Sequence, residues 1–303
     1  MSIAVFGSIN LDLVVRAARL PKPGETLSGH AFQTIPGGKG ANQAVACARL
    51  GAKTIMVGRV GEDEFGGRLK NELGTAGVDH SNVKFDPTVS SGVAVIAVDD
   101  TAENMILVVP GANGKVNDED LQRLESVLSQ SEILLLQLEI PLQIVVAAAK
   151  LAKKMGVKVI LDPAPAQPLP EEIYPVLDII TPNETEAETL VGIPVKTIED
   201  ASRAAQVLKS RGAQNVIIKM GSRGAFASLE EKEEFFASFP VEAVDTVAAG
   251  DAFNGALAVG LSEDNTIEEA IRWGLAGGAF SVTKEGAQPA MPDRNQLFAI
   301  LNQ

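Results

Sequence analysis

The chain has 303 residues, of which 46% are hydrophobic and 21% are charged, a composition typical of soluble globular proteins. Its net charge of −13 and its scattered lysines and arginines argue against a nucleic-acid partner, which needs a basic patch. One cysteine and two histidines exclude an intrachain disulfide and leave little material for Cys- or His-based metal sites or a Ser-His-Asp triad. The start lacks the basic region of a signal peptide, and the longest apolar helix candidate, residues 144–151, is far below the ~20 residues of a membrane span. We therefore expect a cytoplasmic protein with no membrane partner.

Short apolar strands alternate with amphipathic helices along most of the chain. In chain order, the pattern predicts strand 3–7, helix 41–50, strand 54–57, helix 64–73, helix 118–129, strand 133–138, helix 142–155, strand 157–161, strand 179–181, helix 184–191, helix 198–211, strand 216–219 and helix 252–261. Strands that are apolar throughout are typical of a parallel sheet buried on both faces. The prediction is a three-layer α/β/α sandwich with a mostly parallel central sheet.

Two inserts, residues 12–36 and 84–109, interrupt this rhythm. They contain no helix pattern but hold β-favouring runs separated by turn signals. We expect them to pair into a small β-sheet lid on a core of about 1–11, 37–83 and 110–303, within a single domain spanning 1–303. Such a sheet has one face to cover, which favours a homodimer through the lid.

The segment 244–253 carries the most chemical information. We interpret it as a strand end, a turn of very small residues (Ala248, Ala249 and Gly250) and then a helix. The N–H groups of a first helical turn lack partners and can hold an anion, and Asp251 beside them could act as a general base. This combination suits phosphoryl transfer to an alcohol; an ordinary N-cap aspartate is the alternative.

A second glycine-rich segment, residues 36–43, opens the helix 41–50. Its spacing fits neither a P-loop nor the dinucleotide fingerprint. Its glycines would let the backbone approach a polyol, with Lys39 and Asn42 as polar partners, or they could form a hinge. Asn10 and Asp12 follow the first strand, where an α/β sheet binds ligands; an Asx turn is the alternative for Asp12.

Two further strand ends carry polar residues. Asn183 and Glu186 lie three positions apart on one helical face, where they could hold Mg²⁺ through water, or simply cap the helix. The segment from Lys219 through Gly221, Ser222, Arg223 and Gly224 could pass close to a nucleotide or form a plain hairpin turn.

Together these segments resemble the ribokinase branch of the pfkB-type carbohydrate kinases, which also holds fructokinases and adenosine kinase. The resemblance covers essentially the full length of the chain. Its most specific parts are Gly37 through Ala44 and Asp245 through Asp251, and it also includes Asn10-Leu11-Asp12, Glu139, Asn183 with Glu186, Gly221–Gly224 and Lys284–Ala287.

The resemblance implies ATP-dependent phosphorylation of a sugar's primary hydroxyl, with O5 of D-ribose as the best match. Asp251 would be the base, and the N–H groups of residues 248–251 would form the anion hole. The sugar ligands would be Asn10, Asp12, Gly38, Lys39, Gly40, Asn42, Glu139 and Asp251. The nucleotide would face Asn183, Lys219, Gly221, Ser222, Arg223, Gly224, Gly250 and Leu275.

The implied cofactors are ATP, Mg²⁺ and K⁺. The K⁺ ligands carried over are Asp245, Val247, Ser281, Lys284, Gly286 and Ala290, mostly through carbonyl oxygens, and Glu186 would reach Mg²⁺ through water. Leu275 stands where relatives often have a polar residue, which leaves the base selectivity open. A kinase for fructose, 2-deoxyribose or adenosine, and a non-catalytic sugar-binding regulator, remain as alternatives. An oxidoreductase is weaker, because the dinucleotide fingerprint after the first strand is missing.

Overall fold

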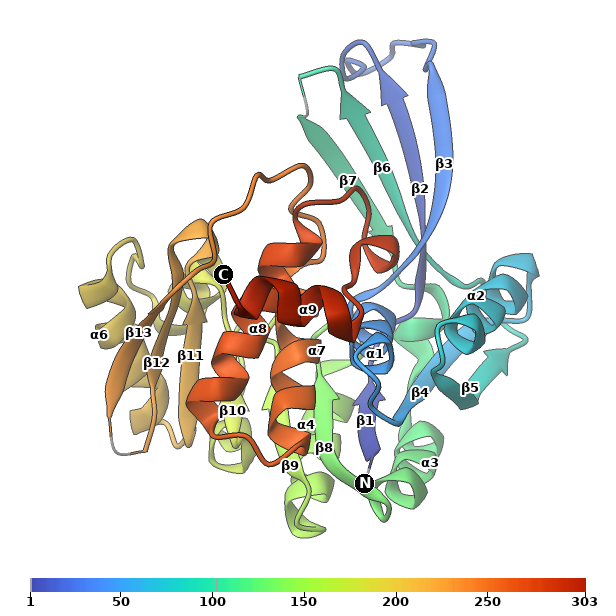
Figure 1. Cartoon of the computed structure of the whole chain (residues 1–303). Coiled ribbons are helices and arrows are strands. Elements are labelled where there is room, and N and C mark those ends of the chain that lie inside the picture. Colours follow the sequence, from blue (N-terminus) through green and yellow to red (C-terminus); the bar gives the residue numbers. More distant parts are fainter. Residues whose placement is uncertain (1, 102, 231) are drawn as a thin grey trace.

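The computed structural model describes residues 2–101, 103–230 and 232–303. Two sheets organise the molecule (Figure 1). The large sheet has the order β13 (Glu233–Ala237), β12 (Gly224–Ser228), β11 (Asn215–Lys219), β10 (Ile179–Ile180), β9 (Lys158–Leu161), β8 (Ser131–Leu136), β1 (Ser2–Phe6), β4 (Thr54–Gly61) and β5 (Asp79–Asp86). The small sheet has the order β3 (Ala31–Gly37), β2 (Asn10–Ala17), β6 (Gly92–Asp99) and β7 (Asn104–Val109).

Helices cover both faces of the large sheet, whose strands are parallel except for β12, which runs antiparallel to its neighbours β11 and β13. One apolar cluster is built with α1 (Lys39–Arg49), α2 (Glu64–Thr75), α7 (Ala249–Ser262), α8 (Ile267–Ser281) and α9 (Arg294–Leu301). The other is built with α3 (Asp118–Leu128), α4 (Leu142–Lys154), α5 (Glu184–Val191) and α6 (Ile198–Ser210). In β1, Ile3 and Val5 face the first cluster and Phe6 the second, as the two-residue period of a strand requires. The predicted three-layer α/β/α architecture with a separate small sheet is confirmed.

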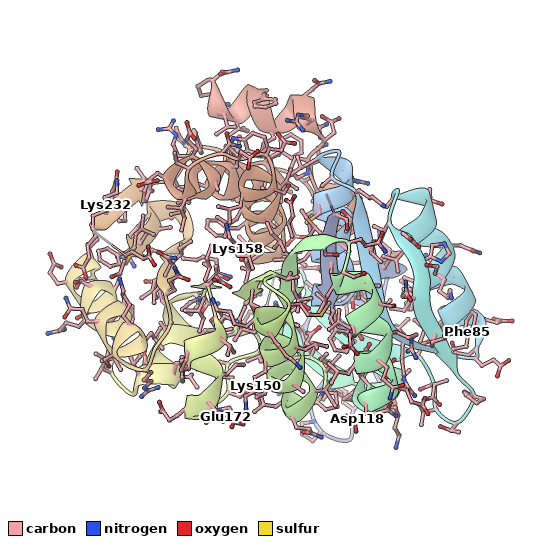
Figure 2. The ribbon with its side chains drawn as sticks, turned by 90° about the horizontal axis from the view of Figure 1, so that it is seen from below. Phe85, Asp118, Lys150, Lys158, Glu172 and Lys232 are labelled. Carbon is pink, nitrogen blue, oxygen red and sulfur yellow. The ribbon has the colours of Figure 1, made fainter. Side chains whose placement is uncertain are left out.

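Figure 2 shows the molecule from below, the side on which Lys158 begins β9. Helices of both layers flank the sheet in this view. The small sheet stands at the opposite end in Figure 1, above the carboxyl ends of the parallel strands. Among the described residues, none of the helices combines the length and the apolar character needed to cross a membrane.

Several elements differ from the sequence prediction. Residues 84–86 pair with β4 in the large sheet, so they do not belong to the lid; the polar edge strand β5 lacks the apolar run that we required of a core strand. No strand precedes the turn at Ala248, because residues 238–247 form a loop. The sequence prediction also missed β12, β13, α8 and α9.

Helix α8 escaped prediction because three glycines lower its helix propensity. The structure shows why one of them is needed. A Cβ at Gly277 would lie 2.9 Å from the carbonyl oxygen of Ala252 and from the Cβ of Ala256, both on α7. The glycine lets α7 and α8 pack in close contact, which supports the helix that carries Asp251.

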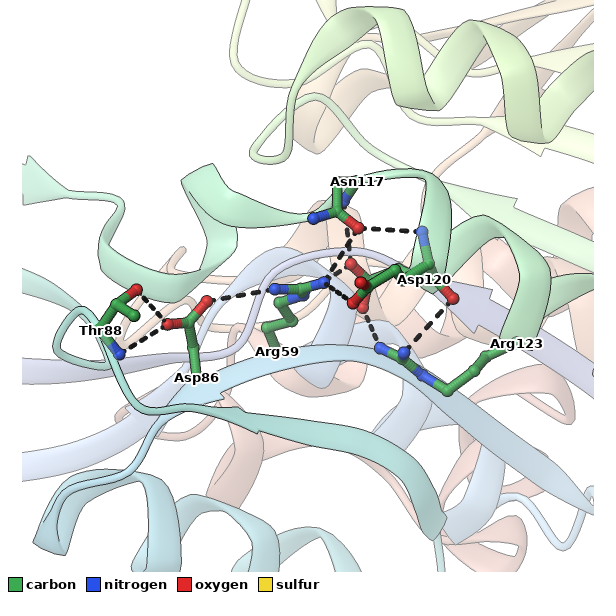
Figure 3. Close-up of polar contacts among 7 residues, drawn as sticks. Arg59, Asp86, Thr88, Asn117, Asp120 and Arg123 are labelled. Carbon is green, nitrogen blue, oxygen red and sulfur yellow. Dashed lines mark hydrogen bonds and ion pairs between the residues drawn. The ribbon is translucent and has the colours of Figure 1, made fainter.

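A polar cluster anchors the chain where it leaves the large sheet toward the small one (Figure 3). The guanidinium of Arg59 on β4 donates to Asp120 at 2.6 Å, to Asn117 at 3.0 Å and to Asp86 at 3.2 Å. Asp86 ends β5 and accepts two hydrogen bonds from Thr88. The base of the small sheet is therefore tied to the core by charge-assisted hydrogen bonds between largely buried side chains.

Candidate active site

Polar residues gather at the carboxyl edge of the large sheet, where parallel α/β folds bind ligands. They come from the ends of five neighbouring strands: Ser8 and Asn10 follow β1, Gln137 and Glu139 follow β8, Asp162 follows β9, Asn183 follows β10, and Lys219 ends β11. The N-termini of α1 and α7 approach the same edge with Lys39, Asn42, Gln43 and Asp251. The hydrogen bonds described below connect most of them.

Asp251 lies in the first turn of α7 and is only 3% exposed. It is not the N-cap, which is Ala248, so the N-cap alternative is wrong. Its Oδ2 accepts from Asn42 Nδ2 at 2.9 Å, and its Oδ1 accepts from Gln43 Nε2 at 3.1 Å. Burial raises the pKa of Asp251 to about 6, although nearby Lys39 acts in the opposite direction. The carboxylate is thus fixed in orientation and more basic than an ordinary aspartate.

Gln43 connects Asp251 to a second buried carboxylate. Its Nε2 also donates to Asp162 Oδ2 at 3.0 Å, while its Oε1 accepts from Gln137 Nε2 at 2.6 Å. Asp162 in turn accepts from Lys219 Nζ at 2.8 Å. Because Gln137 occupies the oxygen of Gln43, both N–H groups of Gln43 must face the two carboxylates.

The N-terminus of α7 has the properties of an anion site. Ala248 adopts a left-handed conformation with φ 59°, and no side chain caps the helix. In the described part of the chain, the N–H groups of Gly250 and Asp251 have no backbone partner, and that of Ala249 reaches Thr246 only at 3.4 Å. A Cβ at Gly250 would lie 3.2 Å from Lys219 Nζ, so a cation stands beside the free N–H groups.

The predicted sugar ligands Asp12 and Glu139 lie near Asp251. Glu139 Oε2 accepts from the backbone N–H of Lys39 at 3.1 Å and from the hydroxyl of Ser8. Burial, together with Glu139 and Asp251, raises the pKa of Asp12 to about 7. Burial lowers the pKa of Lys39, but the carboxylates of Asp251, Asp162, Glu139 and Glu186 outweigh this effect and raise it.

Close backbone approach explains the glycines in this segment. At Gly38, where φ is 87°, a Cβ would lie 2.7 Å from the backbone nitrogen of Asn10. At Gly40 it would lie 2.7 Å from the backbone nitrogen of Ser8. The N-terminus of α1 therefore packs directly against the end of β1. On the same helix, Asn42 Oδ1 is buried without a hydrogen-bond partner among the described residues, which leaves it free for a ligand group.

The remaining residues predicted for the nucleotide and Mg²⁺ lie in three different elements. Asn183 and Glu186 form a capping box at α5, with bonds of 2.7 and 2.8 Å to each other's backbone N–H groups, as the capping alternative expected. Burial raises the pKa of Glu186. The segment Gly221–Arg223 is a turn between β11 and β12, and Arg223 pairs with Glu184. Leu275 is buried in the apolar cluster around α7 and α8.

The predicted K⁺ ligands come from two segments that meet. Asp245 accepts the N–H groups of Val247 at 3.0 Å and Gly286 at 2.9 Å. The side chains of the other two polar ligands are directed elsewhere: Ser281 donates to the carbonyl of Gly278, and the Lys284 ammonium lies over the Phe280 ring. The backbone carbonyl oxygens of Val247, Ser281, Lys284, Gly286 and Ala290 are the remaining candidates. Within the described ranges, no cluster of three His, Cys, Asp or Glu residues could hold a metal.

The sequence prediction missed three residues that complete this site. Asp162 directly follows the predicted strand 157–161, so its strand-end position was a usable signal. Gln43 stands within the glycine-rich segment, but only the fold reveals its contact with Asp251. Asn113, which bonds Asn10, lies more than a hundred residues away from it and has no local signal.

A comparison with known proteins shows which family this fold and sequence belong to. The pfkB family carbohydrate kinase profile matches residues 1–294. The chain belongs to the pfkB family of carbohydrate kinases. Among family members, the ribokinase of Haemophilus influenzae is 44% identical over 300 residues, covering 99% of this chain and 98% of that protein. The deoxyribokinase of Salmonella typhi is 40% identical over 303 residues, covering 100% and 99%.

The solved structures with a similar fold include a ribokinase complexed with ribose and ATP. The ribokinase of Arabidopsis thaliana complexed with ribose and ATP has a TM-score of 0.93 and 38% identity to this chain, covering 100% of this chain and 99% of that one. The similarity therefore spans the two sheets and all the segments that carry the predicted site.

Proposed function

We propose that the protein is an ATP-dependent ribokinase, which transfers the γ-phosphoryl group of ATP to O5 of D-ribose to give D-ribose 5-phosphate. The observation that carries the proposal is the placement of Asp251. Its carboxylate is held by Asn42 and Gln43 immediately beside the unpaired N–H groups of α7. The ribokinase names of its relatives, including one bound to ribose and ATP, support the same reaction.

The chemistry assigned to Asp251 is general-base catalysis. Its ionised carboxylate accepts the proton of the ribose O5 hydroxyl as the bond from O5 to the γ-phosphorus forms and the bond to the ADP oxygen breaks. Because Asn42 and Gln43 hold its two oxygens, little reorganisation is needed to present a lone pair to the hydroxyl. The pKa of about 6 leaves it mostly ionised at neutral pH.

The phosphoryl group is assigned to the N-terminus of α7. The N–H groups of Ala248, Ala249, Gly250 and Asp251 would hold the charge that develops on its oxygens, with Lys219 beside them. Mg²⁺ bound with the nucleotide would neutralise further charge on the phosphate groups. Glu186 would reach it through water, because both of its oxygens already accept hydrogen bonds from Asn183.

The sugar is assigned to the segments around the end of β1. Asn10, Asp12, Asn42 and Glu139 offer side-chain groups for hydroxyls, and Gly38, Lys39 and Gly40 bring backbone close to them. Gly37 leaves room for the side chain of Asp12, because a Cβ at position 37 would lie only 2.4 Å from Asp12 Oδ2. The adenine end of ATP would lie against Asn183, the Gly221–Gly224 turn and Leu275.

The proposed K⁺ site lies where residues 245–247, which precede α7, meet residues 281–290 at the end of α8 and beyond it. Asp245 already joins Val247 to Gly286, so a monovalent cation bound by the nearby carbonyl oxygens would fix the turn that precedes Ala248. The donor set is oxygen, which suits a hard monovalent cation. We assign Asp245, Val247, Ser281, Lys284, Gly286 and Ala290 to it, mostly through their carbonyl groups.

A homodimer through the small sheet is proposed on its exposed apolar surface. The register places Asp12 on the same face as Ala94 and Val108, so Val95 and Leu107 belong to the opposite face. That opposite face exposes 40% of Val95, 71% of Leu107, 56% of Met105 and 63% of Phe32. A second copy could cover it by a self-complementary contact, while the Asp12 face serves as a lid over the sugar.

The decisive experiment is an ATP-consumption assay across D-ribose, 2-deoxyribose, fructose and adenosine. We expect the highest kcat/KM with D-ribose. A higher kcat/KM with 2-deoxyribose would reassign the substrate. This sugar is the second candidate because the chain is 40% identical to a deoxyribokinase. Sugar binding without turnover of any substrate would instead favour the non-catalytic regulator.

A further inference from the structure

Asn113 makes three hydrogen bonds at the base of the small sheet. It lies in η1 (Gly111–Lys115), the short helix after β7, and is only 1% exposed. Its Nδ2 donates to Asn10 Oδ1 at 2.7 Å and to the carbonyl oxygen of Ile9 at 3.1 Å. Its Oδ1 accepts the backbone N–H of Ile9 at 2.9 Å. Rotating this amide by half a turn would place its NH₂ group against the N–H of Ile9 and its oxygen against the carbonyl oxygen of Ile9, so its orientation is fixed.

The fixed amide of Asn113 determines the orientation of Asn10. Because Asn10 Oδ1 accepts from Asn113, the Nδ2 of Asn10 must lie on the other side of its amide. Across the described ranges this Nδ2 has no hydrogen-bond partner, and it is not among the fully buried atoms. The backbone of Asn10 packs on Gly38, which precedes Lys39 at the predicted sugar site. Asn10 therefore presents an N–H donor at the edge of that site.

Gly92 at the start of β6 belongs to the same arrangement. A Cβ there would lie 2.2 Å from Asn113 Nδ2 and 2.3 Å from Asn10 Oδ1, so any side chain would separate the two amides. The preceding residue, Ser91, is held by Asp63 at 2.6 and 2.8 Å. The strand that enters the small sheet is thus fixed to the core next to the amide pair.

We propose that Asn113 is a positioning residue for sugar recognition. It holds the Asn10 amide so that Nδ2 donates to a hydroxyl oxygen of the bound sugar, and it ties that donor to the base of the lid. Asn113 itself does not touch the sugar. This inference rests on the proposed function, since it takes Asn10 as a sugar ligand.

The test is a double-mutant cycle on Asn10 and Asn113, read out as separate kinetic constants. Asn113→Ala should raise the KM for ribose about 5- to 10-fold, the ratio expected for one hydrogen bond, with kcat and the KM for ATP within about twofold. In an Asn10→Ala background, Asn113→Ala should raise the KM for ribose no further, because it acts through Asn10. Gly92→Ala should raise the same constant.

Asn117→Ala is the matched structural control. Asn117 also lies near the base of the small sheet, caps α3 and bonds Arg59, but it does not contact Asn10. It should lower the Tm and leave the KM for ribose unchanged. If Asn113→Ala does not fold, Asn113→Asp keeps the size of the side chain and the acceptor for Ile9 but loses the donor to Asn10, and should raise the KM for ribose.

Two results would overturn the inference. One is an unchanged KM for ribose in the folded Asn113 variant. The other is a KM for ribose in the double variant that rises by the product of the two single-variant factors. Failure of the proposed function gives a different result, namely a wild-type protein that does not turn over ribose. In that case calorimetry with ribose decides the inference, because equal Kd values for the wild type and Asn113→Ala, or no binding to either, would refute it.

Discussion

At the scale of single residues, the site concentrates carboxylates in a buried place. Asp12, Asp162 and Asp251 lie at one edge of the sheet, and two of them have a raised pKa because burial disfavours their charged forms. Lys39 and Lys219 offset part of the repulsion. Such an arrangement gives a base with a pKa closer to neutral pH than that of a free aspartate, which is useful for proton transfer from a hydroxyl.

The role of Asp251 predicts the effect of Asp251→Asn. The kcat should fall by roughly 10²–10⁴, with ribose binding near normal, because the amide cannot accept the proton. In the wild type, kcat/KM should decline as the pH falls below about 6, where Asp251 becomes protonated; the variant should lack this acid limb. Asp79→Asn, at the far edge strand, serves as the control. A variant that retains more than about a tenth of the wild-type kcat would remove Asp251 from the role.

Asp12 predicts a dependence of stability on pH. Its pKa rises from 3.8 to about 7 on folding, so the folded state binds the proton more tightly and stability falls as the pH rises from about 4 through 7. Asp12→Asn removes this effect and should increase the free energy of unfolding at pH 8 by up to about 4 kcal/mol, because each pKa unit of the shift is worth about 1.4 kcal/mol, with little change at pH 4. Urea denaturation at the two pH values measures it.

Asp200→Asn is the control of opposite sign. Backbone N–H groups at the start of α6 lower the pKa of Asp200 to about 2, so its contribution to stability is present above 3.8 and is lost as the pH falls toward 2. Asp200→Asn should therefore reduce stability at pH 8. A destabilising effect of Asp12→Asn at pH 8 would contradict the burial of its charge.

At the scale of elements, the N-terminus of α7 combines an αL residue, small side chains and free N–H groups. Gly250→Val places a branched side chain where the phosphoryl oxygens should lie and against Lys219. We expect the loss mainly in kcat, since the anion hole binds charge best in the transition state. Gly67→Val is the control, because a Cβ there meets nothing within 4 Å. If only the KM for the sugar rises, the anion-hole assignment is wrong.

The contact between the 245–250 segment and Gly286 predicts activation by K⁺. A cation bound beside Asp245 would fix the turn that leads into α7, so activity in K⁺ buffer should exceed that in Na⁺ buffer at equal ionic strength. Asp245→Ala should reduce this difference, because it removes the acceptor that joins Val247 to Gly286. Equal rates of the wild type in the two buffers would argue against the site.

At the scale of the whole molecule, the small sheet is a four-stranded element whose edge strand β7 is exposed along its full length. Such a sheet is not expected to be stable with both faces in water. We predict a homodimer by light scattering at micromolar concentration. Leu107→Glu on the face opposite Asp12 should give monomers, while Phe65→Glu on α2 should not. A monomeric wild type would refute the interface.

The lid role of the same sheet has an independent readout. Ribose should slow hydrogen exchange in β2, β3, β6 and β7, because their base holds Asn10 and Asp12 next to the sugar. An unchanged pattern in these strands would show that the small sheet does not close over the sugar.

Local patterns in the chain were sufficient to predict the architecture and the polar residues at the strand ends. Apolar strands report burial on both faces regardless of context, and amphipathic helices such as 184–191 have a strong local period. The small residues before Asp251 and the glycines around Lys39 are also local signals. The polar edge strand β5 and the glycine-rich helix α8 were missed, because their stability comes from neighbouring elements rather than from their own pattern.

Only the tertiary structure decided which side chains meet. Gln43 lies 208 positions from Asp251, and Asn113 lies 103 from Asn10, yet each pair shares a hydrogen bond. No local pattern encodes such contacts, because they depend on which strand ends become neighbours in the sheet. The same holds for the raised pKa of Asp12 and Asp251, which burial and nearby charges produce only after the fold has formed.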